Sequence, residues 1–180
     1  RELARRNRLV ITGGGPGVME AANLGAYLAT RPEADLTDAI DTLATAPDFM
    51  DHGPFTEVAL AVREKFAPDP AAHWALRGGL SVPTWLYGHE PANLFAGRVA
   101  KYFSNAIRED TLLRLCRGGL VFAPGRAGTV QEVFQAATKT FYGTDGPSGA
   151  YVFLDTAFWT TTLPVRTLLT PLFAQSPHGD

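Results

Sequence analysis

Residues 9–23 of the chain read LVITGGGPGVMEAAN. The apolar run Leu9 to Thr12 predicts a strand, and the apolar positions that follow Gly17 have helical spacing. A glycine loop between a strand and a helix N-terminus directs backbone N–H groups and the positive end of the helix dipole toward one point, which suits phosphate. The candidate nucleotide-binding residues of this first glycine loop are Gly13, Gly14, Gly15 and Gly17, and Met19 is a further candidate. The alternative is that these glycines only form a tight turn.

This loop departs from the G-x-G-x-x-G pattern of dinucleotide-binding proteins, because Val18 stands where the last glycine is required. The acid that would bind a ribose about 20 residues later could only be Glu33 or Asp35, and both lie in a predicted turn. An NAD-dependent oxidoreductase is therefore a weaker alternative.

A second stretch, residues 119–132, reads GLVFAPGRAGTVQE and repeats the order of strand, glycine loop and helix. Its candidate phosphate-binding residues are Gly125, Arg126, Gly128 and Thr129. In the alternative interpretation Thr129 is the helix N-cap and Glu132 completes a capping box. A capping box requires neither glycine, whereas a loop that wraps a phosphate needs close backbone approach.

Apolar strands bounded by Gly or Pro alternate with helical patterns along the whole chain. The predicted strands cover residues 9–12, 80–84, 119–123 and 150–154. The predicted helices cover residues 17–28, 35–46, 55–66, 93–107, 130–141 and 165–174, with a further helix opening at 110–111. Such continuous apolar strands are typical of parallel sheets covered on both faces. We therefore expect an α/β fold, a Rossmann-like doubly wound parallel sheet flanked by helices, in one domain spanning residues 1–180. Because the first residue is Arg1 and not Met, it is left open that an N-terminal strand is missing.

The composition argues against several classes of protein. The 180 residues are 46% hydrophobic with a formal net charge of −2, which fits one soluble domain and argues against a broad nucleic-acid surface. No apolar run reaches the roughly 18 residues of a membrane span. The single Cys116 favours a reducing, cytoplasmic location, and the histidines lack ligand spacing, so we expect neither a metal nor another cofactor.

The two glycine motifs, in this order, resemble the signature of the LOG family. Its members were once labelled lysine decarboxylases and include cytokinin-activating phosphoribohydrolases and bacterial nucleotide 5′-monophosphate nucleosidases. The resemblance extends from Leu9 to about Asp155. It implies a Rossmann-like fold, an AMP-like nucleoside 5′-monophosphate as substrate, and a homodimer or higher homo-oligomer.

In the family, a P-G-G-x-G-T-x-x-E loop holds the 5′-phosphate, and its final Glu acts with an Arg of the preceding helix on the N-glycosidic bond. The resemblance therefore implies Glu132 and Arg108 as the catalytic pair. Arg126 replaces the second glycine of the motif, so it either adds a phosphate contact or blocks the loop. Glu109 stands where many members have Lys. The alternative for Arg108 is a solvated charge on a helix.

His89 and Glu90 follow the second predicted strand, where open parallel sheets place groups that bind ligands. Either His89 and Glu90 line the nucleotide-binding site, or Glu90 and Pro91 simply begin a helix.

These residues predict hydrolysis of a nucleoside 5′-monophosphate to free base and ribose 5-phosphate. Cleavage of the glycosidic bond develops positive charge on the ribose, which a carboxylate at Glu132 would stabilise while it orients or deprotonates the attacking water. The alternative is a carrier or sensor that binds a nucleotide or phosphorylated cofactor without catalysis.

Overall fold

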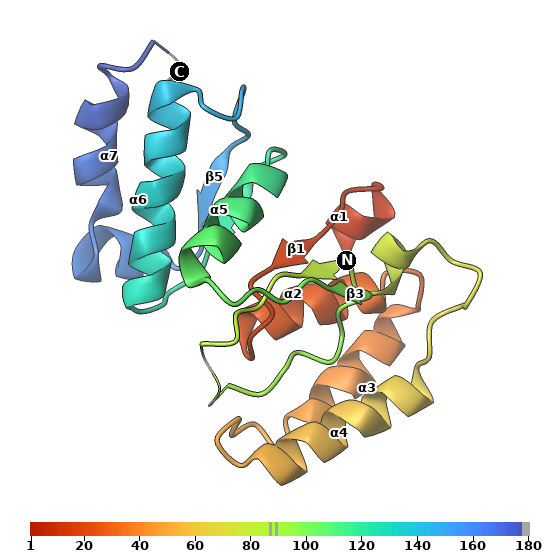
Figure 1. Cartoon of the computed structure of the whole chain (residues 1–180). Coiled ribbons are helices and arrows are strands. Elements are labelled where there is room, and N and C mark those ends of the chain that lie inside the picture. Colours follow the sequence, from red (N-terminus) through yellow and green to blue (C-terminus); the bar gives the residue numbers. More distant parts are fainter. Residues whose placement is uncertain (87, 89, 178–180) are drawn as a thin grey trace. The chain divides into compact units, whose positions relative to one another are not determined.

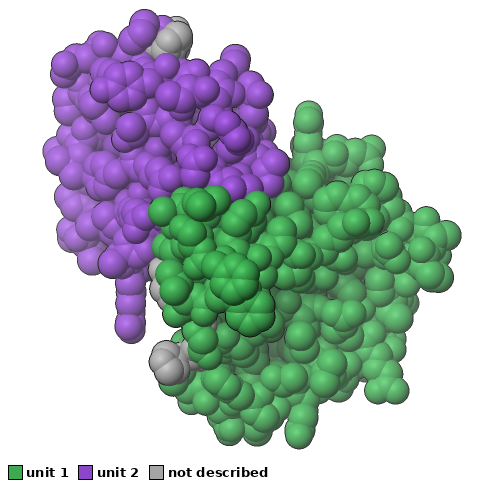
Figure 2. Space-filling model, in the orientation of Figure 1, with its two compact units in different colours: residues 1–108 green, residues 109–180 purple. Residues whose placement is uncertain are grey.

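The computed structural model describes residues 1–86, 88 and 90–177. The chain forms two compact units, residues 1–108 and residues 109–180 (Figure 2). Each unit combines helices with a small parallel sheet (Figure 1), so the predicted α/β class is confirmed. That the chain acts as one domain stays a prediction.

The first unit contains a three-stranded parallel sheet in the order β1-β2-β3. Its elements are α1 (Glu2–Arg5), β1 (Ile11–Thr12), α2 (Val18–Tyr27), α3 (Glu33–Leu43), α4 (His52–Lys65), the 3-10 helix η1 (Trp74–Arg77), β2 (Leu80–Ser81) and β3 (Arg98–Val99). Helices α3 and α4 pack side by side (Figure 1). The core of this unit includes Leu24 of α2, Leu28 directly after that helix, Ala59 and Val62 of α4, and the fully buried Phe95.

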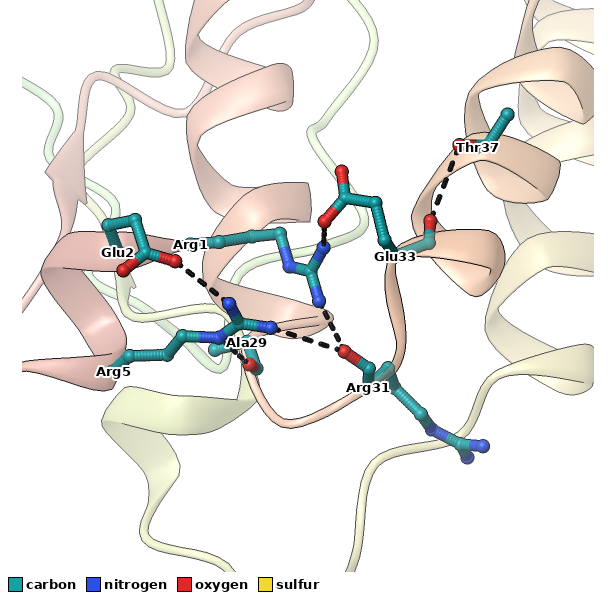
Figure 3. A network of polar contacts seen from close by, with 7 residues as sticks. All are labelled: Arg1, Glu2, Arg5, Ala29, Arg31, Glu33 and Thr37. Carbon is teal, nitrogen blue, oxygen red and sulfur yellow. Dashed lines mark hydrogen bonds and ion pairs between the residues drawn. The ribbon is translucent and has the colours of Figure 1, made fainter.

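The chain start is tied to this unit by arginine side chains (Figure 3). Arg5 Nε donates to the carbonyl of Ala29 at 2.7 Å. The Arg1 guanidinium donates to the Glu33 carboxylate and to the Arg31 carbonyl. These bonds join the first residues of the chain to the segment that follows α2.

Helix α5 (Asn105–Leu115) begins in the first unit and continues into the second. The further elements of the second unit are β4 (Leu120–Phe122), α6 (Ala127–Tyr142), β5 (Tyr151–Phe153), the π-helix η2 (Phe158–Thr162) and α7 (Val165–Phe173). Strands β4 and β5 pair in parallel. Their core partners include Val133 and Ala137 of α6, Trp159 and Leu169. Helix α6 ends at Gly143, whose φ of 61° is the left-handed conformation common after helices.

The predicted strands are present but shorter than expected. Within the second unit, the paired residues Val121 and Val152 are 57% and 46% exposed, so helices of this unit do not cover both faces of the β4–β5 pair. A doubly wound, Rossmann-like sheet stays a prediction.

Between residues 93 and 115 the sequence prediction is partly wrong. No helix covers residues 93–104, a segment that contains β3 and the buried Phe95. The side chain of Asn93 accepts a hydrogen bond from the Phe95 N–H at 2.9 Å, a turn that competes with helix formation. One helix, α5, then runs through residues 110–111, so no separate helix opens there.

Within the described residues, none of the helices combines the length and apolar character that crossing a membrane requires.

Replacing Phe95 by Ala tests the core of the first unit. Phe95 is 0% exposed and its ring packs edge to face against Tyr27, so we expect a loss of about 3–5 kcal/mol in the free energy of unfolding. Urea unfolding measures it, with the exposed Leu60→Ala as a control that changes stability by about 0.5 kcal/mol or less. Equal effects of the two substitutions would contradict this core assignment.

Candidate functional site

The first glycine loop connects β1 to α2. Gly14 and Gly17 have φ values of 82° and 71°, which lie in the region that side chains disfavour. Gly17 is the N-cap residue of α2, so the loop delivers the chain directly to a helix N-terminus. The positive φ values alone therefore explain why glycine is found at these two positions, without a ligand.

Three side chains lie against the other two glycines of this loop. A Cβ atom at Gly13 would stand 3.0 Å from Met19 Sδ and 3.3 Å from Arg108 Nη1. A Cβ atom at Gly15 would stand 2.7 Å from Met19 Cε and 3.1 Å from Glu90 Oε2. The structure therefore brings the candidates Met19, Glu90 and Arg108 to one place in the first unit.

Neither Arg108 nor Glu90 has the purely structural role that the sequence left open for it. Arg108 is only 5% exposed, so it is not a solvated helix charge, and Asn105 Oδ1 accepts from its Nη2 at 2.6 Å and its Nε at 3.2 Å. Glu90 and Pro91 begin no helix. Glu90 is exposed, whereas the candidate His89 lies outside the described residues.

A buried network of polar side chains holds the first glycine loop, and the sequence analysis missed it. Thr12 Oγ1 donates to Asn23 Oδ1 at 2.6 Å and accepts from the Gly14 N–H at 3.2 Å. Asn93 Nδ2 donates to the same Asn23 oxygen at 2.7 Å, and the Asn93 N–H donates to the Gly14 carbonyl at 3.1 Å. The signal in the sequence was Asn23 itself, an amide next to the apolar positions Ala22 and Leu24 of the predicted helix, and the structure buries it fully.

Glu20 places a carboxyl group at the N-terminus of α2. The residue is 8% exposed, and its Oε1 is buried without a hydrogen-bond partner among the residues that the structure describes. Burial raises the pKa of this carboxyl above its ordinary value, while a hydrogen bond from the Gly17 N–H acts in the opposite direction. A phosphate at this helix end would lie next to the Glu20 carboxyl, which weakens the case for phosphate at the first loop.

The second glycine loop leads from β4 into α6. Arg126 is the N-cap residue and its side chain makes no capping hydrogen bond within the described chain. Thr129 lies inside the helix, so the alternative interpretation, in which Thr129 is the N-cap of a capping box with Glu132, is wrong. No acidic residue occupies residues 127–130, so this N-terminus lacks the intramolecular carboxylate found at α2.

The two glycines of the second loop differ in what surrounds them. A Cβ atom at Gly125 would stand 2.1 Å from Thr129 Oγ1, so the protein itself requires a glycine there. A Cβ atom at Gly128 would meet no described atom within 4 Å. Packing therefore does not explain why residue 128 is a glycine. The absence of a Cβ atom there leaves the first turn of α6 accessible to a ligand.

Glu132 lies one turn further along α6. Burial, reinforced by the negative charge of Glu132, raises the pKa of the Cys116 thiol to about 11. The preceding residue, Gln131, donates a hydrogen bond from Nε2 to Oε2 of the fully buried Glu109. Glu109 therefore connects α5 to α6 through Gln131.

A cavity of about 30 Å³ in the second unit is lined by residues including Cys116, Lys139 and Asp145. It has room for roughly one water molecule and none of the candidate residues lines it. Among the described residues, no cluster of three His, Cys, Asp or Glu side chains could hold a metal ion.

Glu20→Gln tests the buried carboxyl. Because burial raises the pKa of Glu20 in the folded state, folding binds a proton over the interval above 4.5, and stability falls as pH rises through it. The glutamine variant keeps the hydrogen-bond acceptor without the charge. We expect it to be more stable than the wild type at pH 7 in urea unfolding, with the difference shrinking toward pH 4.5. A difference independent of pH would show that the charge of Glu20 is not the cause.

Gly128→Ala and Gly125→Ala separate binding from packing in the second loop. Alanine at residue 128 meets open space and favours helix, so stability should stay equal or rise by up to about 1 kcal/mol. Binding of ribose 5-phosphate, measured by calorimetry, should weaken about tenfold, because the added methyl group would push the phosphate away from the backbone N–H groups of this turn and lengthen a charge-assisted hydrogen bond. Alanine at residue 125 clashes with Thr129 and should cost about 1–3 kcal/mol of stability. Unchanged binding by Gly128→Ala would argue against a phosphate there.

Comparison of the chain with protein-family models, curated proteins and solved structures gives no match. The resemblance to the LOG family therefore rests on the two glycine motifs and their order along the chain.

Proposed function

We propose that the chain is a Rossmann-like member of the LOG family that hydrolyses the N-glycosidic bond of a nucleoside 5′-monophosphate. The products are the free base and ribose 5-phosphate. The observation that carries this proposal is the N-terminus of α6, where an open Gly128 and the exposed Arg126 adjoin a helix end with no capping side chain in the described chain.

The phosphate belongs to this second loop on electrostatic grounds. A helix N-terminus attracts an anion through its free N–H groups and its dipole. Arg126 is a cation at the N-cap, so in the free protein it is repelled by the positive end of the helix dipole. A bound phosphate dianion would neutralise both the charge of Arg126 and the positive helix end. Thr129 contributes a hydroxyl donor from the same turn. Arg126 thus adds a phosphate contact in this proposal and does not block the loop.

Glu132 is the catalytic carboxylate of the proposal. As the glycosidic bond breaks, positive charge develops on the ribose, and a carboxylate stabilises that charge while it orients or deprotonates water. Glu132 lies on α6, one turn beyond the proposed phosphate-binding residues. The neighbouring Gln131 donates a hydrogen bond to Glu109, which holds this part of α6 against α5.

In the first unit, Glu90 lies next to Gly15 and Arg108 lies next to Gly13. Nucleotide binding by this loop and a catalytic role of Arg108 stay predictions. Asn105 orients the Arg108 guanidinium, so this group is set in place before a ligand binds. A homo-oligomer and a cytoplasmic location stay predictions.

Glu132→Gln tests the assignment. The variant keeps the size of the side chain and removes its charge, so release of ribose 5-phosphate from AMP should fall by about 10²–10⁴-fold while AMP still protects the protein against thermal unfolding. Glu64→Gln, an exposed Glu of α4, is the matched control and should retain full activity.

The wild-type chain is assayed first with AMP, GMP, CMP and UMP. Release of ribose 5-phosphate from none of them, combined with thermal protection by a nucleotide, would contradict the enzyme and favour the carrier or sensor. Full activity of Glu132→Gln would remove Glu132 from the mechanism.

A further inference from the structure

Strand β3 forms an edge of the sheet in the first unit. Within the described chain it pairs with β2 alone. The N–H groups of Arg98, Ala100 and Tyr102 donate to carbonyl groups in or next to β2 at 3.0, 2.9 and 3.0 Å. Because successive residues of a strand direct their backbone groups to opposite sides, the N–H and C=O groups of Val99 and Lys101 point away from β2. An edge of this kind can pair with a further strand.

The side chains on one face of this edge are exposed, and most of them are apolar. Val99 is 60% exposed and Phe103 is 81% exposed. The Phe103 ring stacks on that of Trp85, which is itself 55% exposed, with ring centroids 5.8 Å apart. Since Val99, Lys101 and Phe103 are spaced by two residues, they share one face of the extended segment. The edge therefore presents an apolar, a positive and an apolar side chain in turn.

The two cations of this segment have no acidic partner in the described chain. Lys101 Nζ lies 3.9 Å from the centroid of the Trp85 ring, and Arg98 Cζ lies 5.3 Å from the centroid of the Trp74 ring. Both cations thus contact aromatic rings, whereas the ion pairs among the described residues of the first unit involve other cations. A carboxylate on an added strand would lie opposite Lys101, where opposite charges stabilise a sheet.

The charge of Lys101 disfavours a second copy of the chain as the added strand. Antiparallel pairing of two copies over the whole segment 99–103 would place the two Lys101 side chains directly opposite each other. Like charges in that position destabilise a sheet, and charged residues on edge strands prevent self-pairing in this way. An acidic strand meets no such repulsion.

We propose that β3 is a docking edge for an extended acidic segment of a partner protein, which adds to the sheet as a further strand. Main-chain hydrogen bonds to Val99 and Lys101 hold the segment in place. Its specificity comes from an acidic residue opposite Lys101, flanked by apolar residues that contact Val99 and Phe103. This surface lies within the first unit and does not depend on the proposed function.

Two synthetic peptides with blocked ends test this edge: Thr-Val-Thr-Glu-Thr-Val-Thr, and the same sequence with Lys in place of Glu. Calorimetry with the wild-type chain should show about tenfold tighter binding of the Glu peptide, because the Lys peptide places a like charge opposite Lys101. Lys101→Glu should reverse this preference. Arg166→Glu changes the net charge equally at an exposed position of α7 in the second unit, and it should keep the wild-type preference.

Amide hydrogen exchange identifies the mode of binding. When the Glu peptide binds, exchange should slow at Val99 and Lys101 and stay unchanged at Arg98 and Ala100, whose N–H groups already donate toward β2. Binding of neither peptide, equal affinities for the two, or binding without protection of Val99 and Lys101 would each overturn the proposal. A dimer in sedimentation that Val99→Lys dissociates would assign the edge to a second copy and overturn it as well.

Discussion

The hydrogen bonds of the buried Asn23 side chain are the interaction on which the first unit depends. An amide with 0% exposure must have partners, and it finds them in Thr12 at the end of β1 and in Asn93 of the loop before β3. Asn93 in turn binds the backbone carbonyl of Gly14. One amide thus connects the helix, the strand and, through Thr12 and Asn93, the glycine loop. Loss of these partners would leave polar groups buried and unpaired, which costs far more than an exposed hydrogen bond.

The two glycine loops look alike in sequence and differ in charge. At the N-terminus of α2, the carboxyl of Glu20 accepts from the Gly17 N–H and occupies the place of an anion. At the N-terminus of α6, the N-cap residue is a cation and the first turn contains no acid. Our proposal therefore places the phosphate at the second loop. The difference in charge follows from the third residue of each helix, which is Glu20 in α2 and Thr129 in α6.

Much of this fold could be predicted from apolar runs and glycines, because strands that end in Gly and helices with periodic apolar faces leave local patterns. The segment 93–107 could not, since its apolar residues match helical spacing while the turn at Asn93 directs the chain into β3. The same limit applies to the site. Spacing alone made Thr129 a plausible N-cap, and only the position of Arg126 showed where α6 begins. The approach of Glu90 and Arg108 to one loop depends on tertiary contacts that no local pattern contains.

The central claim is that the N-terminus of α6 binds the phosphate. Amide hydrogen exchange of the wild-type chain, with and without ribose 5-phosphate, measures this directly, because bound phosphate must accept hydrogen bonds from the free N–H groups of that turn. The account predicts slower exchange at Ala127, Gly128 and Thr129 and little change at the first turn of α2. Protection confined to α2, or to neither helix, would contradict it.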